Sequence, residues 1–199
     1  MKLILASNNK NKLLEFREIL AGTGIEVIPQ SEAGCNFEGH ETGERFEENA
    51  LLKAEAAMKA TGLPAVSDDS GLEVDALGGA PGVHSARYTG NHDDSDLDRR
   101  LFLMKNLEGE EHRTARFVSA ICCVFPNGDV LNARGTCEGS IATYMAGENG
   151  FGYDAMFIPE GGSRTMGEMS HEEKNLISHR GRALREFARI LKEYCNADK

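Results

Sequence analysis

Two long, mostly apolar segments in the second half of the chain limit its fold more than any other feature. Residues 113–125 and 129–144 both read as extended strands, and the dipeptide Asn127-Gly128 between them is a typical hairpin turn. The pair therefore predicts two long antiparallel strands. Because they are long for a small α/β unit, we expect them to form the spine of the sheet.

The first half of the chain alternates short strands with helices. Residues 2–6 read as a buried strand, and apolar residues then recur at helical spacing up to Gly22. A second strand follows at 25–28, and a helix is expected over about 44–60. At 199 residues the chain is long enough for one domain, or for one domain with an additional lobe. These patterns predict an α/β protein.

Composition and charge narrow the class of protein. Acidic residues outnumber basic ones by 32 to 22, and this excess argues against a general nucleic-acid binder, which needs a basic stripe. A nucleotide substrate is compatible with it, since a triphosphate requires only local cations and a metal. The five cysteines are odd in number, and no apolar run is long enough to be a membrane helix or a signal peptide. We therefore expect a cytoplasmic protein with reduced cysteines and no membrane partner.

Two adjacent acids follow a short apolar run in the stretch 65–90. Asp68 and Asp69 stand where we expect a buried strand to end, and Ser70-Gly71 follows them. Paired carboxylates at a strand end offer oxygen ligands to a hard cation. A plain turn between two strands explains the same residues, because Asp, Ser and Gly are ordinary turn formers. The stretch alone does not decide between a metal site and a turn.

A polar turn separates the first strand from the first helix. It contains Ser7, Asn8, Asn9, Lys10, Asn11 and Lys12. A helix start presents backbone N–H groups and the positive end of the helix dipole, which favour an anion such as phosphate. The alternative is a capped helix with solvated lysines, because the turn lacks the glycine pattern of a P-loop.

The helix expected at 44–60 carries two polar residues on one side. Asn49 and Lys53 are four residues apart, so they share a face away from the apolar stripe. Several glutamates cluster at the start of this helix, where acids suit the dipole. Glu41 lies in the preceding loop, where it is better placed to reach a metal.

Two further segments are candidates for ligand binding. Residues 147–154 are rich in glycine around Phe151 and Tyr153, so the backbone can approach a ligand and an exposed Phe can stack on a base. A tight loop with both rings in the core is the alternative. Near the C-terminus, Ser170 and Glu173 form a capping-box pattern at the start of a short helix. His179 and Arg180 then precede the long last helix, either at the surface or as donors to a ligand.

With these segments in hand, the sequence resembles the inosine triphosphate pyrophosphatase family (HAM1 or RdgB-like non-standard purine triphosphate pyrophosphatases). The resemblance covers nearly the whole chain and rests on separate motifs in the same order. They are SNNKNK at 7–12, ETGERFEENALLKA at 41–54, SDDSGLEVDALGGAPGVHSARY at 67–88, GFGYDAMF at 150–157 and EEKNLISHRG at 172–181.

The resemblance implies a fold and an activity. The fold would be a single domain over 1–199, with an elongated mixed β-sheet flanked by helices in two lobes and a cleft between them. The family hydrolyses non-standard purine triphosphates such as ITP, dITP and XTP to the monophosphate and pyrophosphate. It uses Mg²⁺ and usually forms homodimers, so we expect a purine nucleoside triphosphate and a second copy of the chain as partners.

The resemblance also implies roles for individual residues. The 7–12 turn would hold the triphosphate, with Lys53 beside the phosphates. Asp69 would bind the metal and activate water, with Glu41 as a second metal ligand and Asp68 in support. Further substrate contacts would come from Ser70, Phe151, Gly152, Tyr153, Asp154, Lys174, His179 and Arg180.

The sequence departs from the family pattern at two places. Ser7 and Asn8 stand where the family commonly has Thr and Gly, and Ala155 stands where proline is frequent. Neither change removes a charged group, so we expect activity to survive, with loop rigidity in question.

The expected chemistry is water attack at the α-phosphate with Mg²⁺ and lysines neutralising charge. His179 and Arg180 donating to a 6-oxo group would disfavour adenine, whose 6-amino group is itself a donor. Two other functions compete with this one. A related hydrolase for pyrimidine or modified nucleotides would differ in its substrates, and a non-catalytic nucleotide-binding regulator would not need Glu41, Lys53 and Asp69.

Overall fold

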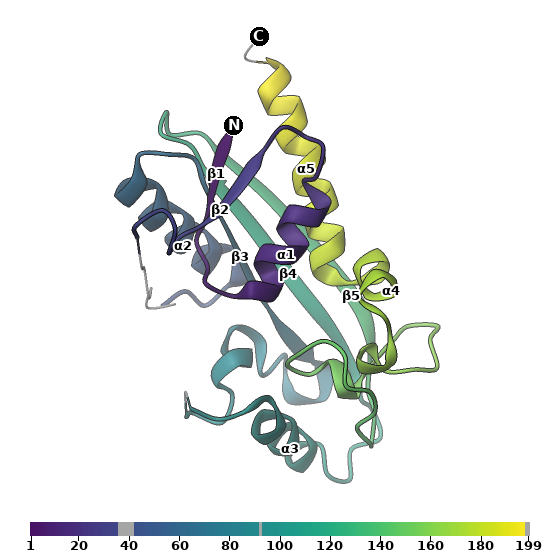
Figure 1. The fold of residues 1–199 in the computed structure, drawn as a ribbon. Helices are drawn as coiled ribbons and strands as arrows, with labels where there is room; N and C mark the ends of the chain where they lie inside the picture. The colour runs from purple at the N-terminus through teal and green to yellow at the C-terminus, as the bar shows by residue number, and fades with distance from the viewer. Residues whose placement is uncertain (36–41, 92, 198–199) are drawn as a thin grey trace. The chain divides into compact units, whose positions relative to one another are not determined.

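The structure is a computed structural model and describes residues 1–35, 42–91 and 93–197 (Figure 1). Its strands are β1 (Lys2–Leu5), β2 (Glu26–Pro29), β3 (Ala65–Val74), β4 (Thr114–Val124), β5 (Val130–Ile141) and β6 (Phe157–Pro159). Its α-helices are α1 (Lys10–Ile19), α2 (Phe46–Thr61), α3 (Asp96–Asn106), α4 (His171–Ile177) and α5 (His179–Ala197). Short 3₁₀ helices lie at Asp75–Leu77, Gly82–Arg87, Asp154–Met156 and Met166–Glu168.

The strands form one mixed sheet in the order β2-β1-β3-β4-β5-β6. β1 pairs in parallel with β2 and with β3, whereas β5 pairs antiparallel with β6. The predicted α/β fold with a mixed sheet and flanking helices is therefore confirmed. The two long predicted strands are β4 and β5, and β4 occupies an inner position next to β3.

The chain divides into two compact units, which we describe separately. Unit 1 comprises Met1–Asp69, Ser119–Gly135 and Arg180–Lys199, and unit 2 comprises Ser70–Val118 and Thr136–His179. The predicted cleft between two lobes of a single 1–199 domain stays a prediction.

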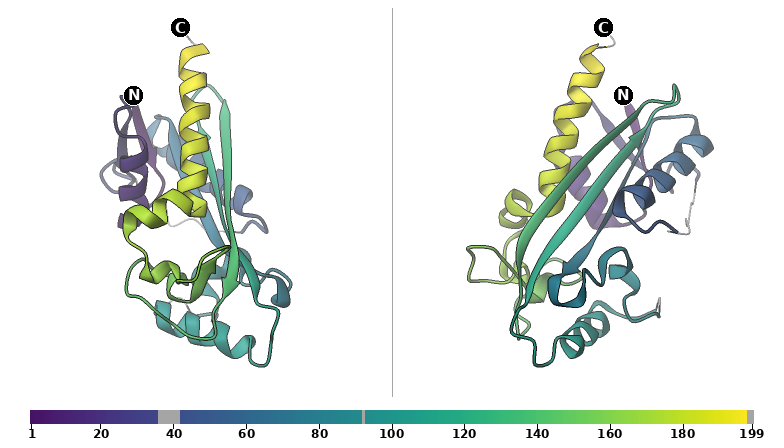
Figure 2. Two further views of the ribbon diagram at one scale, coloured as in Figure 1. Left: turned by 90° about the vertical axis from the view of Figure 1, so that its right-hand side faces the viewer. Right: turned by 180° about the vertical axis from the view of Figure 1, so that it is seen from behind.

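In unit 1, helices cover both faces of the sheet. α1 and α5 lie on one face and α2 lies on the other, as the two further views also show (Figure 2). Leu3 and Leu5 of β1 pack with Phe16 of α1 and Phe187 of α5, whereas Ile4 packs with Ala57 of α2. This alternation follows from the strand period of two, so apolar residues in succession bury both faces of the strand.

β4 repeats the alternation through its two adjacent cysteines. Cys123 packs in the cluster of α1 and α5, whereas Cys122 packs against Ala50 and Ala54 of α2. Burial raises the pKa of the Cys122 thiol to about 12, and Glu55 contributes in the same direction. Both thiols are therefore protonated near neutral pH and serve as apolar packing groups.

Unit 2 has an apolar core of its own. Strand residues such as Leu72 and Phe117 pack with Leu103 of α3 and with Tyr153 and Met156 from the segment before β6. This core supports the loop at 147–155, because Tyr153 is 4% exposed and anchors the loop through its ring.

The helix ends follow the local sequence signals. α2 ends at Gly62, which has a left-handed φ of 67° that a non-glycine residue rarely adopts. Ser170 and Glu173 form the predicted capping box at the start of α4. Ser178 is extended and separates α4 from α5. The prediction that His179 and Arg180 precede the last helix is wrong, because α5 begins at His179 and both residues lie in its first turn.

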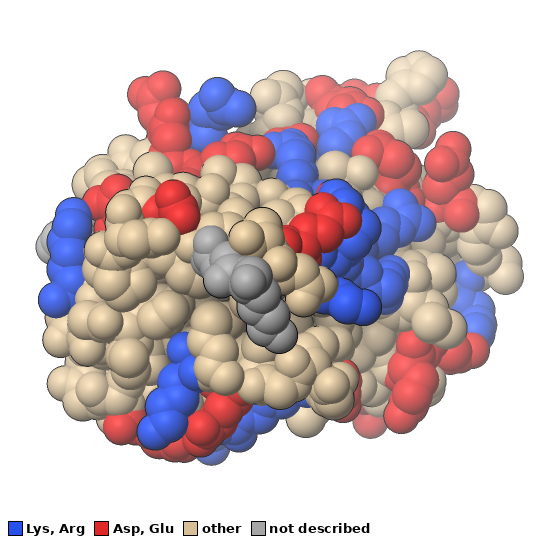
Figure 3. Space-filling view, turned by 90° about the horizontal axis from the view of Figure 1, so that it is seen from above, with Lys and Arg blue, Asp and Glu red and all other residues tan. Residues whose placement is uncertain are grey.

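Acidic and basic side chains are interspersed on the face shown in Figure 3. Within the described ranges, no helix is both long enough and apolar enough to cross a bilayer.

Candidate active site

Asp68 and Asp69 lie inside β3, which continues from Ala65 to Val74 without a break. The predicted strand end at these acids is therefore wrong, and the alternative of a plain turn between two strands is wrong as well. Asp and Gly are poor strand formers, and β1 pairs with β3 at Ala65 and Val66, before the acids. Next to them the Asp68 carbonyl accepts from the Lys12 and Lys53 ammonium groups at 2.9 and 3.3 Å, so tertiary contacts outweigh the local preference. Because neighbouring residues of a strand face opposite ways, the two carboxylates point to opposite faces of the sheet.

Asp68 points toward α1 and α5 and is 2% exposed. The Lys12 ammonium lies 2.8 Å from its Oδ2, and the Arg180 Nε donates to the same oxygen at 3.2 Å. The Ser119 hydroxyl of β4 donates to Oδ1. Arg180 also donates to Glu15 of α1 at 2.8 Å, and both of these side chains are buried. We call these five residues the Asp68 network.

Opposing effects set the protonation states in the Asp68 network. Burial alone would raise the pKa of Asp68, but Lys12 and Arg180 outweigh it and hold that pKa far below its usual range. Burial lowers the pKa of Lys12, assisted by repulsion from Lys53 and Arg180, although Asp68 acts in the opposite direction. Asp68 is therefore ionised at neutral pH, and its negative charge holds the cations at this face of β3.

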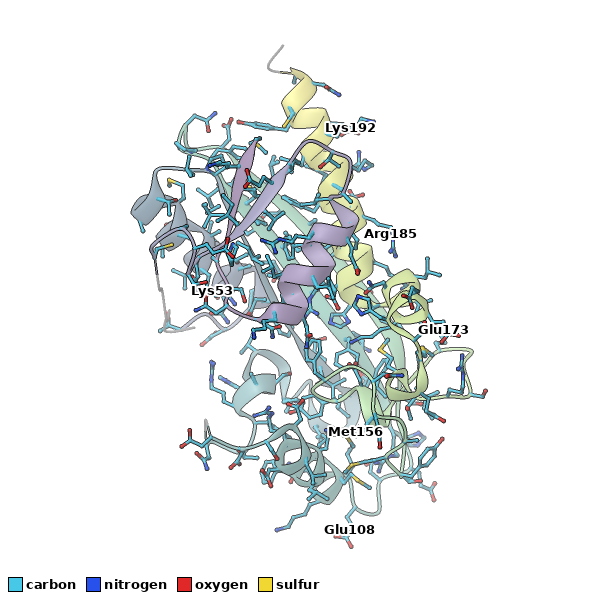
Figure 4. The ribbon with its side chains drawn as sticks, viewed as in Figure 1. Lys53, Glu108, Met156, Glu173, Arg185 and Lys192 are labelled. Carbon is cyan, nitrogen blue, oxygen red and sulfur yellow. The ribbon has the colours of Figure 1, made fainter. Side chains whose placement is uncertain are left out.

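Asp69 points toward α2 and is 5% exposed. The Lys53 ammonium lies 2.7 Å from its Oδ1, and the Asn49 amide donates to Oδ2 at 3.3 Å. Lys53 lies on α2 (Figure 4). The predicted common face of Asn49 and Lys53 on one helix is confirmed, because both side chains reach the same carboxylate. We call these three residues the Asp69 group.

Two hydrogen bonds hold α2 in place for this contact. The Ser67 hydroxyl of β3 donates to the Ala50 carbonyl at 2.5 Å. The Gly43 backbone N–H donates to the Asn49 Oδ1 at 2.8 Å, so Asn49 also connects the segment before the helix to Asp69. A Cβ at Gly43 would lie 2.8 Å from that Oδ1, which explains a residue without a side chain at this position.

The polar turn at 7–12 caps α1. The Asn9 Oδ1 accepts from the backbone N–H groups of Asn11 and Lys12, at 2.9 and 3.1 Å, and the Asn9 N–H donates to the Ser7 hydroxyl. The capped-helix alternative thus holds for Asn9. It fails for Lys12, which is mostly buried and bound to Asp68 rather than solvated. Three other residues of the turn are exposed, namely Asn8, Lys10 and Asn11, and the phosphate role of the turn stays a prediction.

In unit 2, residues 150–154 form a loop that we call the phenylalanine loop. The Asp154 Oδ2 accepts from the Phe151 backbone N–H at 2.8 Å and from the Lys174 ammonium at 2.7 Å. That ammonium lies 4.7 Å from the centroid of the half-buried Phe151 ring. The ring, the carboxylate and the cation thus form one group. A pocket of about 250 Å³ adjoins it, lined by the loop and by Asp96 and Arg100 of α3.

The remaining predicted residues of unit 2 have different surroundings. Tyr153 is buried, and its hydroxyl donates to the Ser85 carbonyl at 2.9 Å, so its ring packs in the core as the alternative interpretation expects. The His179 ring is buried and stacks on Phe117 with the centroids 4.8 Å apart. Ser70 is half-buried in β3. The substrate roles of these residues stay predictions.

Sequence reasoning missed three polar residues of these groups. Glu15 stands next to Phe16 on α1, and Ser119 interrupts the apolar run of β4. In both cases the available signal was a polar residue among apolar residues that were expected to be buried. Asp96 gave no such signal, because an acid at the start of a helix is ordinary. It accepts a hydrogen bond from Gly152 in the phenylalanine loop.

The predicted metal ligands are only partly described. Glu41 lies outside the described residues, so its pairing with Asp69 stays a prediction. Over residues 1–35, 42–91 and 93–197, no cluster of three or more His, Cys, Asp or Glu side chains could hold a metal ion. Asp69 can contribute a carboxylate to a site that substrate oxygens complete.

Comparisons with known proteins match nearly the whole chain to proteins of one family. The model of the Ham1 family matches residues 3–190. A relative from Exiguobacterium sp. named dITP/XTP pyrophosphatase is 48% identical over 94% of this chain and 95% of its own length. The solved structure of a HAM1 protein from Coxiella burnetii has a TM-score of 0.91 at 42% identity, with 97% of this chain and 99% of that chain covered. The Staphylococcus aureus Ham1 protein has a TM-score of 0.87 at 40% identity, with both chains fully covered.

Proposed function

Because the chain belongs to the Ham1 family, we propose that it is a nucleoside triphosphate pyrophosphohydrolase. It converts non-standard purine triphosphates, namely ITP, dITP and XTP, to the monophosphate and pyrophosphate, and so removes them from the nucleotide pool. Curated relatives that match over nearly their whole length bear the name dITP/XTP pyrophosphatase, which supports this activity. The observation that carries the chemistry is the buried Asp69 carboxylate bound to Lys53, beside a second carboxylate that gathers further cations.

The triphosphate is proposed to bind at the Asp68 network and the Asp69 group. Lys12 and Lys53 bring ammonium groups to the two faces of β3 at neighbouring residues, and Ser7 to Asn11 add hydrogen-bonding groups at the start of α1. Burial lowers the pKa of Lys12, and a polyanion beside it would raise that pKa again. Phosphate binding is therefore coupled to retention of the Lys12 proton.

We propose that a divalent ion binds in this region, and the balance of formal charges supports it. Among the described residues of the two groups, the cations Lys12, Lys53 and Arg180 are matched by the carboxylates Glu15, Asp68 and Asp69. The formal charges cancel, so a bound triphosphate leaves a large negative excess. Asp69 fits Mg²⁺ because a carboxylate is a hard oxygen donor, and Mg²⁺ takes roughly one or two protein carboxylates beside phosphate oxygens. Asp69 and Glu41 would hold the ion, which when bound neutralises phosphate charge.

Asp69 is proposed to act as the general base. A water molecule hydrogen-bonded to its carboxylate attacks the α-phosphorus, and the proton of that water passes to Asp69. The bond from the α-phosphorus to the bridging oxygen breaks, and pyrophosphate leaves with both electrons of that bond. Lys53 and Asn49 bind the two oxygens of Asp69 and fix the direction of its lone pairs. Asp68 supports the reaction by holding Lys12 and Arg180.

The phenylalanine loop is proposed to bind the purine base. Phe151 offers a ring face for stacking, and Gly152 permits close approach of the backbone. The Lys174 ammonium over that ring and the Asp154 carboxylate that accepts from it provide a donor and an acceptor beside the base. His179 and Arg180 remain the proposed donors to the 6-oxo group, and such donors disfavour adenine.

The wider setting of the enzyme is also proposed. We expect a homodimer in the cytoplasm that binds neither nucleic acid nor membrane. The excess of acidic over basic residues, 32 to 22, supports the absence of nucleic-acid binding. Sedimentation velocity tests the dimer, since a single monomeric species would contradict it.

Pyrophosphate release from ITP, dITP, XTP, ATP and GTP, with and without Mg²⁺, tests the function. The expected result is Mg²⁺-dependent release from the first three and little from ATP or GTP. Release from pyrimidine triphosphates at the same rate would favour the related hydrolase, and binding without release would favour a regulator.

A matched pair of lysine variants tests the site. Lys53→Met removes the cation bound to Asp69, whereas Lys59→Met on the same helix removes one bound at the surface to Glu55. We expect Lys53→Met to lower kcat about 100-fold or more, as loss of a transition-state contact does, and Lys59→Met to retain it. Equal activity of the two variants would remove the Asp69 group from the mechanism.

A further inference from the structure

Asp96 of α3 binds the backbone of the phenylalanine loop. Its Oδ2 accepts from the Gly152 N–H at 2.6 Å, and its Oδ1 accepts from Arg99 at 2.5 Å. Both oxygens are thus in use, and one of them reaches a residue 56 positions away in the sequence. Arg99 lies in the next turn of the same helix, so it holds the carboxylate in the orientation that meets the loop.

This carboxylate has no part in capping its own helix. The capping box of α3 is formed by Ser95 and Asp98, which exchange hydrogen bonds between side chain and backbone. Asp98 is exposed, whereas the side chain of Asp96 is two-thirds buried at 33% exposure. Two acids in one helical turn therefore make different contacts: Asp98 caps the helix, and Asp96 binds the phenylalanine loop.

The loop amides bind two carboxylates that differ in origin. The Phe151 N–H donates to Asp154, which belongs to the loop itself and sets its internal shape. The next N–H, that of Gly152, donates to Asp96, which belongs to a regular helix. Gly150 and Gly152 have φ values of 75° and 58°, and these hydrogen bonds hold the left-handed backbone in addition to the buried Tyr153 ring. Asp96 thus ties the loop to the scaffold at the residue after Phe151.

We propose that Asp96 is a positioning residue that fixes the phenylalanine loop, and with it the Phe151 ring, for a purine base. This inference rests on the proposed function for the identity of the ligand. Burial raises the pKa of Asp96, but the Gly152 N–H and Arg99 outweigh burial and lower it, so the acceptor is ionised at neutral pH. A charge-assisted bond to a backbone N–H is stronger than a neutral one, which suits a tether for a glycine-rich loop.

The test compares Asp96→Ala, Asp96→Asn and Asp98→Ala in the full chain. We expect Asp96→Ala to raise the KM for ITP about tenfold or more, the effect of losing a hydrogen bond to a charged group, with kcat nearly unchanged. Asp96→Asn retains an acceptor oxygen and should recover most of this loss. Asp98→Ala removes an acid from the same turn and should leave KM unchanged, since its bonds stay within the helix cap.

Inhibition by inorganic tripolyphosphate distinguishes an effect on the phenylalanine loop from an effect on the phosphate site. It has no base, so its inhibition constant should be the same for the parent and for Asp96→Ala. If that constant rises together with the KM for ITP, Asp96 acts on the whole fold and the proposal is overturned. The proposal is also overturned if the KM for ITP is unchanged in Asp96→Ala.

Amide hydrogen exchange at Gly152 tests the tether without any turnover. We expect faster exchange of this amide in Asp96→Ala, and exchange as in the parent in Asp98→Ala. Parent-like exchange in Asp96→Ala would overturn the proposal even if the enzyme is active. If the parent hydrolyses no triphosphate while exchange responds as expected, the proposed function fails and the tether stands.

Discussion

The two regions that we propose to bind the nucleotide are built in different ways. In unit 1, Asp68 and Asp69 project from a strand and meet side chains of α1, α2 and α5, so regular structure fixes every charged group. In unit 2, the phenylalanine loop depends on glycines with positive φ and on backbone amides that donate to Asp96 and Asp154. We therefore expect changes in the Asp68 network mainly to lower stability, and changes in the phenylalanine loop mainly to weaken binding.

The largest effect is expected for Asp68→Ala in unit 1. Without this carboxylate, the buried cations Lys12 and Arg180 lose the anion that both of them contact. Breaking a buried ion pair in this way costs about 3–5 kcal/mol. Urea denaturation measures the change in the free energy of unfolding. Asp75→Ala is the control, because Asp75 pairs with Arg116 at the surface and should matter little. Equal losses in the two variants would contradict the contrast between buried and exposed pairs.

A smaller loss of stability with a clear loss of binding is expected for Gly150→Ala. Gly150 has a φ of 75°, and a Cβ there would lie 2.1 Å from the Asp154 Oδ2. Alanine should therefore displace Asp154 from Phe151 and Lys174, with a rise of about tenfold in the KM for ITP and a stability loss of about 1–3 kcal/mol. Steady-state kinetics and urea denaturation measure the two effects.

Gly161→Ala is the matched control for this loop. Gly161 has a φ of 74°, so alanine suffers the same backbone strain, but nothing lies within 4 Å of its Cβ position. The KM for ITP should stay at the parent value. A rise in KM for both variants would mean that backbone strain alone, rather than the contact with Asp154, weakens binding.

The sequence predicts contacts within one element far better than contacts between elements. Asn49 and Lys53 are four residues apart on a helix, so their common face was predictable, and both reach Asp69. The capping box of α4 was predictable for the same reason. By contrast, Glu15 and Arg180 are 165 residues apart, and no local period relates them. The Asp68 network therefore depends on which helices the sheet brings together.

The local sequence signal also gave the wrong structure where tertiary contacts opposed it. The segment Ser67-Asp68-Asp69-Ser70-Gly71 has the composition of a turn, yet it is the middle of β3. Cations from three helices stabilise its acids, and two of these cations, Lys12 and Lys53, also donate to the Asp68 carbonyl, so tertiary structure makes a strand from turn residues. The proposed function depends on this strand, because a strand sends two adjacent carboxylates to opposite faces.

The smallest expected effect is the pH dependence of the free energy of unfolding. It can be measured for one acid in each region, Asp68 and Asp96. Lys12 and Arg180 outweigh burial and hold the pKa of Asp68 below its unfolded value of about 3.9. The stabilisation from its charge is therefore complete above about pH 4 and is lost as the pH falls through the folded pKa. Between the unfolded and the folded pKa, Asp68 is protonated in the unfolded chain but still ionised in the folded protein. One such group changes the free energy of unfolding by at most about 1.4 kcal/mol per pH unit.

Asparagine variants isolate this dependence. Asp68→Asn cannot take up the proton, so its deficit in unfolding free energy relative to the parent should shrink as the pH is lowered from about 5 to about 3. The pKa of Asp96 is also lowered, since Gly152 and Arg99 outweigh burial, but its side chain is one-third exposed and solvent screens its partners. The deficit of Asp96→Asn should therefore shrink less over the same range. Urea denaturation at each pH measures both deficits, and parallel curves for the two variants would mean that burial does not distinguish the acid of the sheet from the acid that holds the loop.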